Sequence, residues 1–276
     1  MPKSQCDVYF YSPYRDSDTK TTHWQNLPLL VFLPGLNETG QGLMSRQMAS
    51  LKNKFDIRCL VIPPKDLDGW DVIAESTIAL IEAELTQNNR PVYLCSESFG
   101  GCLALKMLSQ TSNLFAKTIL INPASSFYRV PWLNFGSYLF PLTPEWIYYQ
   151  SAFFTLPFLT HVDKISPQAC EDLADTIRCT SKHTAYKRIV MMRDFSIDES
   201  QLRQIQQPIL LIGSREDLIL PSVEEAERLA RIFPQATVVT LPHSGHACLV
   251  EPDIDLYQIM QANNFVSQTE LILNSY

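Results

Sequence analysis

The chain has 276 residues, with 46% hydrophobic and 18% charged side chains, as in a globular protein. Its length suits one large α/β domain or a domain with an insertion. The net charge of −7 and the lack of a basic block exclude nucleic acid as an expected partner. Because no apolar stretch is long enough to span a bilayer and the first residues lack a signal-peptide core, we expect a cytoplasmic protein.

The cysteines are odd in number, scattered along the chain and without a C-x-x-C spacing. This pattern predicts reduced, mostly buried thiols rather than a disulfide framework. No group of His, Cys, Asp and Glu residues shows the spacing of metal ligands. We therefore expect neither a metal ion nor a cofactor. The cysteines are Cys6, Cys59, Cys95, Cys102, Cys170, Cys179 and Cys248.

Apolar runs and amphipathic stretches alternate along the first part of the chain. After a short segment with strand character at residues 8–11, residues 29–33 form a continuous apolar run that ends at a Pro-Gly pair. Residues 57–62 form a second run. Residues 71–87 repeat apolar side chains every three or four positions, which indicates an amphipathic helix.

The same alternation continues toward the C-terminus, with Ser222 as the expected N-cap of the last predicted helix. The further predicted strands cover residues 92–95, 118–121, 208–212 and 237–241, and the helices between them cover residues 101–108 and 223–232. Continuous apolar strands separated by helices are typical of a mostly parallel central sheet with helices on both faces.

One segment breaks the alternation. Residues 123–207 separate two predicted strands that a single crossover helix could connect. We predict that this excess forms an inserted, mainly helical cap, and that residues 1–122 and 208–276 form the α/β core. The first half of the predicted cap is rich in aromatic side chains, and prolines divide it into short pieces.

Two interpretations of these aromatic side chains stay open. They can pack the cap onto the core, or they can line an apolar acyl pocket, with a face that could also make peripheral contact with a membrane. The interpretations overlap because one side chain can serve both purposes. We name Phe127, Trp132 and Phe135 as candidate substrate-binding residues.

Ser98 lies in the segment Ser96–Gly100, between a predicted strand and a predicted helix. A serine at such a sharp turn, with Gly two residues later, is a candidate nucleophile elbow. The turn projects the hydroxyl above the strand ends and places it at a helix N-terminus, where negative charge is favoured. Ser96 replaces the usual first Gly, so the match to G-x-S-x-G is incomplete.

A nucleophilic serine needs a histidine base and a carboxylate, which follow the serine along the chain in this architecture. Asp217 follows the strand predicted at residues 208–212, and His246 follows the strand predicted at residues 237–241. Both positions lie beyond carboxyl ends of parallel strands, where such sheets place their sites. Glu216 is the alternative acid, and His243 is the alternative base.

An oxyanion hole completes this group and requires two backbone N–H donors. One should come from the residue after the nucleophile, which is Phe99. The other should come from the loop after the first long strand, where we choose Leu36. Glycines at positions 35, 40 and 42 allow the backbone of this loop to approach a ligand closely.

Several segments resemble the α/β-hydrolase superfamily, and more narrowly the hydrolase-like part of the plant and cyanobacterial phytyl ester synthase group. They are Phe32–Gly35, Val61–Pro63, Glu97–Leu105, Asn122–Phe127 and Ser244–Ala247. The resemblance implies an α/β-hydrolase fold and a lipid-acyl substrate, with Ser98, Asp217 and His246 in the triad roles.

The chain departs from that group in three ways. Besides Ser96, it has Asn37–Gly40 where the group often has Asp-Gly-Thr-Gly, and Glu38 would add a carboxylate near the site. The plant proteins also carry a second, acyltransferase domain, for which we see no room before Tyr276. We therefore expect hydrolysis of carboxylic esters, with acyl transfer to a long-chain alcohol or diacylglycerol as one alternative. A non-catalytic homologue that binds a lipid or a protein is the other alternative.

Overall fold

The computed structural model describes residues 7–13, 27–36, 41–64 and 69–266. Its strands form one sheet in the order β1-β3-β2-β4-β5-β6-β7, in which β1 is antiparallel to β3 and the other neighbours are parallel. This arrangement confirms the predicted α/β sheet. The strands are β1 (Tyr9–Tyr11), β2 (Leu29–Leu33), β3 (Asp56–Val61), β4 (Val92–Glu97), β5 (Lys117–Ile121), β6 (Ile209–Ser214) and β7 (Ala236–Leu241).

The inner strands are mainly apolar because both of their faces are buried. In β2, Leu29, Val31 and Leu33 belong to one hydrophobic cluster, whereas Leu30 and Phe32 belong to the other. This follows from the strand geometry, which points successive side chains to opposite faces.

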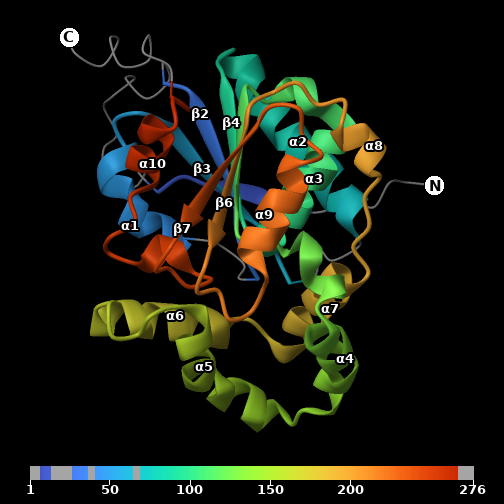
Figure 1. The fold of residues 1–276 in the computed structure, drawn as a ribbon, viewed down its shortest axis with the longest axis vertical. Coiled ribbons are helices and arrows are strands. Elements are labelled where there is room, and N and C mark those ends of the chain that lie inside the picture. The colour runs from blue at the N-terminus through green and yellow to red at the C-terminus, as the bar shows by residue number, and fades with distance from the viewer. Residues whose placement is uncertain (1–6, 14–26, 37–40, 65–68, 267–276) are drawn as a thin grey trace.

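Helices cover both faces of the sheet, as predicted (Figure 1). One cluster contains buried residues of α2 (Trp70–Gln87), α3 (Phe99–Thr111) and α9 (Ser222–Ala230). The other contains residues of α1 (Gln41–Leu51) and α10 (Leu256–Ala262). Two hydrophobic layers therefore hold the strand ends, and the residues that follow them, in fixed positions.

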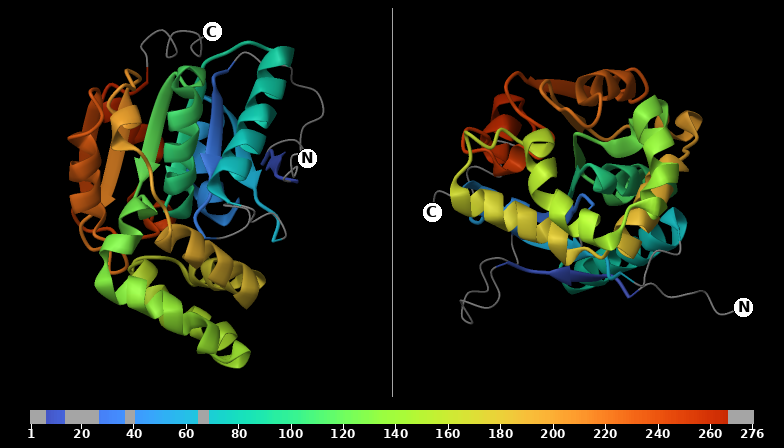
Figure 2. Two further views of the ribbon diagram at one scale, coloured as in Figure 1. Left: turned by 90° about the vertical axis from the view of Figure 1, so that its right-hand side faces the viewer. Right: turned by 90° about the horizontal axis from the view of Figure 1, so that it is seen from below.

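The chain between β5 and β6 is helical, and we call this part the cap. It consists of η3 (Ala124–Arg129), α4 (Pro131–Leu139), η4 (Phe140–Leu142), α5 (Glu145–Leu159), α6 (Pro167–Cys179), α7 (Lys182–Arg193) and α8 (Glu199–Leu202). Its helices α4 to α7 lie beyond the carboxyl ends of the strands, whereas α8 returns along α3 (Figures 1 and 2). Ser166 and Ser181 cap α6 and α7 through side-chain acceptors.

Some predicted details differ from the structure. The helix predicted over residues 223–232 spans 222–230, and Ser222 is its first residue rather than its N-cap. Its hydroxyl points back to Asp217 and donates a hydrogen bond to that carboxylate, rather than accepting one from a backbone N–H as an N-cap would. The predictions that involve Cys6, Glu38 and Gly40 lie outside the described residues.

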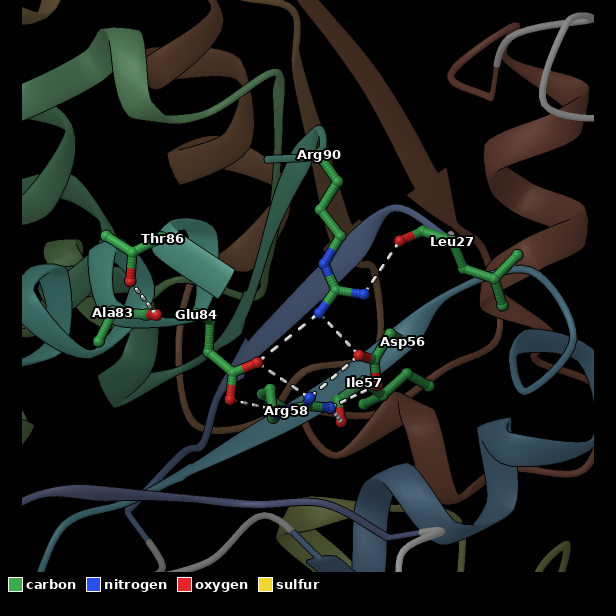
Figure 3. Close-up of polar contacts among 8 residues, drawn as sticks. All are labelled: Leu27, Asp56, Ile57, Arg58, Ala83, Glu84, Thr86 and Arg90. Atoms are coloured by element: carbon green, nitrogen blue, oxygen red, sulfur yellow. Dashed lines mark hydrogen bonds and ion pairs between the residues drawn. The ribbon is translucent and has the colours of Figure 1, made fainter. Parts of the chain in front are cut away.

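A buried ionic cluster occupies the amino end of the sheet (Figure 3). The Arg58 guanidinium binds both oxygens of Asp56 at the start of β3 and both oxygens of Glu84 near the end of α2. Arg90, just before β4, binds Asp56 at 2.7 Å and the carbonyl oxygen of Leu27 at 3.2 Å. Two cations and two carboxylates therefore neutralise each other at this end.

In the part of the chain that the structure describes, no helix is long and apolar enough to cross a membrane. Within the same residues, no cluster of His, Cys, Asp and Glu side chains could hold a metal ion.

Candidate active site

Ser98 occupies a strained turn between β4 and α3. Its φ of 51° and ψ of −113° place a non-glycine residue in a region that side chains disfavour. Gly100 permits this turn, because a Cβ there would lie 2.3 Å from the Leu33 carbonyl oxygen. A Cβ on Gly101 would lie 2.7 Å from Cβ of Pro123. The two glycines after the serine therefore let α3 pack directly against neighbouring backbone.

Ser96 fits the position where the related group has Gly. Its side chain is fully buried, and its Oγ lies 3.4 Å from the carbonyl oxygen of Ile119 on β5. This departure from the motif accordingly leaves the elbow intact.

The structure brings Ser98, His246 and Asp217 into one hydrogen-bonded chain. His246 Nε2 lies 2.9 Å from Ser98 Oγ, and His246 Nδ1 lies 2.7 Å from Asp217 Oδ2. Asp217 Oδ1 accepts hydrogen bonds from the backbone N–H groups of Ile219 and Leu220 at 2.8 and 3.0 Å. The arrangement is that of a nucleophile, a base and a carboxylate that orients the base.

Burial and charge act against each other in this group. Burial disfavours the Asp217 carboxylate, but its charge interaction with His246 and its hydrogen bonds hold its pKa below the usual range. Burial would also lower the pKa of His246, but the Asp217 and Glu97 carboxylates together raise it. Asp217 is therefore prepared to stabilise the imidazolium that forms when His246 accepts a proton.

The alternative acid and base lie in a separate cluster. The Glu216 carboxylate is 3.2 Å from His243 Nδ1 and 2.7 Å from His161 Nε2. The His243 side chain is 78% exposed, whereas that of His246 is 8% exposed. Glu216 and His243 thus pair at the surface, and Asp217 and His246 point to Ser98.

The two predicted oxyanion donors lie beside the serine. Phe99 is the first residue of α3, so its N–H has no acceptor within the helix. The loop after β2 passes close to the elbow, because a Cβ on Gly35 would lie 3.6 Å from Ser98 Cβ. Leu36, the next residue, lines the same pocket as Ser98. Both backbones are therefore near the place where an oxyanion would form.

Asn122 ties the segments that carry the acid and the base to each other. It has a φ of 44°, and its side-chain amide donates to the carbonyl oxygen of His246 at 2.7 Å and to Ser214 Oγ at 2.9 Å. Its Oδ1 accepts from the Ser214 N–H at 2.8 Å. The sequence flagged Asn122 only as part of a family motif, and its structural role depends on residues far away in the chain.

The loop that carries His246 is also held by contacts with the cap. The Ala247 N–H donates to the carbonyl oxygen of Leu159, the last residue of α5, at 2.7 Å. The buried Glu251 carboxylate accepts from the Gly245 N–H at 2.9 Å and from Thr160 Oγ1 at 3.2 Å. These contacts hold the backbone on both sides of His246.

A cavity of about 290 Å³ opens onto Ser98 and His246. Its wall is mainly apolar and includes Phe140, Tyr148 and Met192 from the cap. Pockets of this kind, with a few polar groups at one point, are typical of small-molecule sites.

Glu97 is the one carboxyl group among the described residues that line this cavity. Its side chain is buried, and its Oε2 has no hydrogen-bond partner in the described part of the chain. Burial, opposed by His246 and reinforced by Asp217, raises its pKa to about 7. No pattern in the sequence predicted a role for this residue.

The three candidate substrate-binding residues do not all lie in the same place in the structure. Phe127 lines the cavity. Trp132 and Phe135 do not, and they lie on the outer side of α4 with 59% and 67% of their surface exposed. The large aromatic side chains of α4 lie on its exposed side and its buried residue is Ser137, so a rule that places apolar side chains inward fails for this helix.

Comparisons with known proteins agree with this fold. A model of the alpha/beta hydrolase family matches residues 30–255. Two chloroplastic proteins of Arabidopsis thaliana, phytyl ester synthases 1 and 2, are 28% and 27% identical over 86% and 87% of this chain. The chain spans only 37% and 38% of the length of these two relatives.

A solved structure, a thermophilic esterase from Thermogutta terrifontis, superposes with a TM-score of 0.66 at 19% sequence identity. The match covers 94% of this chain and 92% of the esterase. At this identity the likeness concerns the fold. Because the family model covers most of the sequence, including the elbow, the acid and the base, the chain belongs to the alpha/beta hydrolase family.

Proposed function

We propose that this protein is a serine hydrolase that cleaves carboxylic esters, with a lipid acyl group as the substrate portion held in the pocket. The observation that carries the proposal is the hydrogen-bonded chain from Asp217 through His246 to Ser98, which ends in a mainly apolar cavity. An apolar cavity suits a hydrocarbon chain, and the hydroxyl at its end suits attack on the acyl carbon.

The reaction would proceed through an acyl-enzyme. His246 Nε2 takes the proton of the Ser98 hydroxyl while Ser98 Oγ bonds to the acyl carbon. The N–H groups of Phe99 and Leu36 stabilise the resulting oxyanion. Collapse of this intermediate breaks the ester bond, and His246 returns the proton to the leaving alcohol. A water molecule, activated by His246, then releases the acid and restores Ser98.

A fluorophosphonate probe tests the nucleophile. We expect labelling of the wild type and none of Ser98→Ala, with a matched loss of p-nitrophenyl ester hydrolysis. Ser96→Ala is the control, because Ser96 lies two residues away and is buried in the sheet. Equal labelling of wild type and Ser98→Ala would overturn the assignment.

Acyl transfer to a long-chain alcohol is the second candidate, and it uses the same acyl-enzyme. The similarity to the two phytyl ester synthases favours it, as does the apolar wall around Ser98. The distinction is whether an alcohol or water removes the acyl group. We would incubate the protein with an acyl donor and phytol or diacylglycerol and separate the products. Formation of free acid alone would reject transfer.

The non-catalytic alternative has less support. A degenerate hydrolase that serves as a binding module would not need its histidine within hydrogen-bond reach of the serine. Here that separation is 2.9 Å, and Asp217 holds the histidine from its other nitrogen.

We also propose that the outer side of α4, η4 and α5 contacts a lipid surface. Between Pro131 and Thr160 the sequence contains one charged residue, Glu145. Aromatic and apolar side chains exposed together on helices suit the membrane interface. The exposed side chains of this outer surface are Trp132, Phe135, Tyr138, Leu139, Leu142, Trp146, Ile147, Tyr149, Phe154 and Phe158.

Flotation with phosphatidylcholine vesicles tests the lipid contact. We expect the wild type to float with the vesicles and the double variant Leu142→Asp, Phe154→Asp to remain behind. Tyr9→Asp is the control, since Tyr9 is 52% exposed but lies on β1. The surface would belong to a contact with a second copy instead if the wild type did not float and sedimented as a dimer, while the double variant sedimented as a monomer.

A further inference from the structure

Arg188 is a buried arginine of the cap that lies behind the active site. It belongs to α7 and has no exposed surface. Its helix neighbours Ala185, Ile189 and Met192 line the cavity, whereas Arg188 itself is not part of the wall. A guanidinium in this position cannot touch a substrate in the cavity directly, so any effect on the reaction passes through the residues that it contacts.

Those contacts are made with the segments that follow β2 and β3. Arg188 Nη1 donates to the carbonyl oxygen of Leu36 at 2.5 Å, and Nη2 donates to the carbonyl oxygen of Ile62 at 2.8 Å. The guanidinium carbon also lies 5.6 Å from the centre of the Phe99 ring. One side chain of the cap therefore contacts both residues whose N–H groups would form the oxyanion hole.

We propose that Arg188 is a positioning residue that sets the geometry of the oxyanion hole from the cap. The inference rests on the proposed function. The planar guanidinium holds the backbone after β2 through Leu36 and the backbone after β3 through Ile62, at a fixed spacing. The cation–π contact between the guanidinium and the Phe99 ring keeps the first turn of α3 in place relative to that loop.

This arrangement makes the oxyanion donors depend on the docked cap. A donor misplaced by a fraction of an ångström stabilises the tetrahedral intermediate less, while the ground-state substrate in the pocket is little affected. Loss of Arg188 should therefore lower kcat far more than it raises KM. A side chain that only filled space in the cap would affect KM or folding instead.

The test uses Arg188→Lys and Arg188→Ala in the full chain. We expect Arg188→Ala to lower kcat by about 10- to 100-fold with KM within about threefold, below the ~10²–10³-fold effect of deleting a donor outright. Arg188→Lys should lose less activity, because an ammonium group can bind one of the two carbonyl oxygens but cannot bind both as the planar guanidinium does. Added methylguanidine should restore part of the activity of Arg188→Ala. If that variant does not fold, the lysine variant decides.

An alkyl trifluoromethyl ketone provides a second readout, because it forms a serine adduct that carries an oxyanion. Its affinity should fall in parallel with kcat, whereas the matching unreactive alkyl methyl ketone should bind as tightly as to the wild type. Arg193→Ala is the control, since Arg193 ends the same helix but contacts Asp194 and Tyr138. It should keep wild-type kcat.

The outcomes separate the two proposals. A wild type that neither hydrolyses esters nor reacts with the fluorophosphonate overturns the proposed function and this inference with it. A wild type that reacts, together with folded Arg188 variants of unchanged kcat or unchanged ketone-adduct affinity, overturns only the role of Arg188.

Discussion

The two ends of the sheet treat buried charge differently. At the amino end, Arg58 and Arg90 neutralise Asp56 and Glu84. At the carboxyl end, the carboxyl groups of Glu97 and Asp217 both interact electrostatically with one imidazole, that of His246.

The difference shows where a buried charged group can take part in a reaction. A cluster whose charges all have partners gains nothing by changing its protonation, so it acts only on stability. A site that has more carboxyl groups than cations, together with a histidine that can be neutral or protonated, can transfer a proton. Removal of a charge at the amino end should therefore change stability without changing kcat, and removal of the Asp217 charge at the carboxyl end should lower kcat. The following variants test this contrast.

The largest expected effect is that of Asp217→Asn on kcat. The amide keeps an oxygen for the Ile219 and Leu220 N–H groups, but it cannot stabilise the imidazolium or hold the required tautomer. We expect kcat for ester hydrolysis to fall by about 10³- to 10⁴-fold. Glu216→Gln is the control, since Glu216 pairs with surface histidines, and it should keep activity within about twofold. A comparable loss in both variants would contradict the assignment of the acid.

At the opposite end, Asp56→Ala should reduce stability. It leaves Arg58 and Arg90 buried with one carboxylate between them, which typically costs ~3–5 kcal/mol. Urea unfolding should show the loss, while kcat below the melting transition stays unchanged. Asp71→Ala, at an exposed carboxylate 3.6 Å from Lys106, should cost ~1 kcal/mol or less. A fall in kcat of folded Asp56→Ala would break the separation of the two ends.

Gly100→Ala tests the elbow. The added methyl would lie 2.3 Å from a backbone oxygen of Leu33, and neither backbone can move without shifting β2 or α3. We expect a loss of about 3 kcal/mol, at the upper range for overpacking, together with a loss of activity. Gly136→Ala in α4 is the matched control, because no atom lies within 4 Å of its added Cβ. It should gain up to ~1 kcal/mol from helix propensity.

Glu97→Gln should change how stability depends on pH. The pKa of Glu97 is raised to about 7 from an ordinary value of 4.5, so between these values the unfolded chain is ionised and the folded chain is protonated. Stability should therefore fall as pH rises through this window, by up to about 3 kcal/mol, and stay level above it. The glutamine variant should lack this fall. Urea titrations at pH 5 and pH 8 measure it, and parallel behaviour of the two proteins would contradict the inference.

Much of the fold followed from local patterns. The strands β2 to β6 are mainly apolar because both faces of the sheet are covered, so their composition predicted a parallel sheet. The chain order of Ser98, Asp217 and His246 likewise predicted which strand ends would meet. The choice between Asp217 and Glu216 rested on loop direction, which the sequence indicates only weakly.

Other features depend on contacts between residues far apart in the chain. In the sequence Arg188 is one of several basic residues of α7, yet it is buried against carbonyl oxygens more than a hundred residues away. Asn122 joins two loops in the same way. In α4 the exposed positions carry the larger apolar side chains, so the usual rule that apolar residues face inward could not place Trp132 and Phe135.

Two of the contacts that tie the cap to the core lie next to the base and to the oxyanion loop. The Leu159 carbonyl holds the backbone next to His246, and Arg188 holds the backbone at Leu36. A cap that swung away as one rigid lid would break both attachments and displace the base and the oxyanion loop together. While both attachments stay in place, we expect esters to enter through a passage opened by rotation of side chains in the cavity wall, which includes Phe140 and Tyr148. The width of that passage, rather than the rate of a hinge motion, should then limit how bulky an ester the protein accepts.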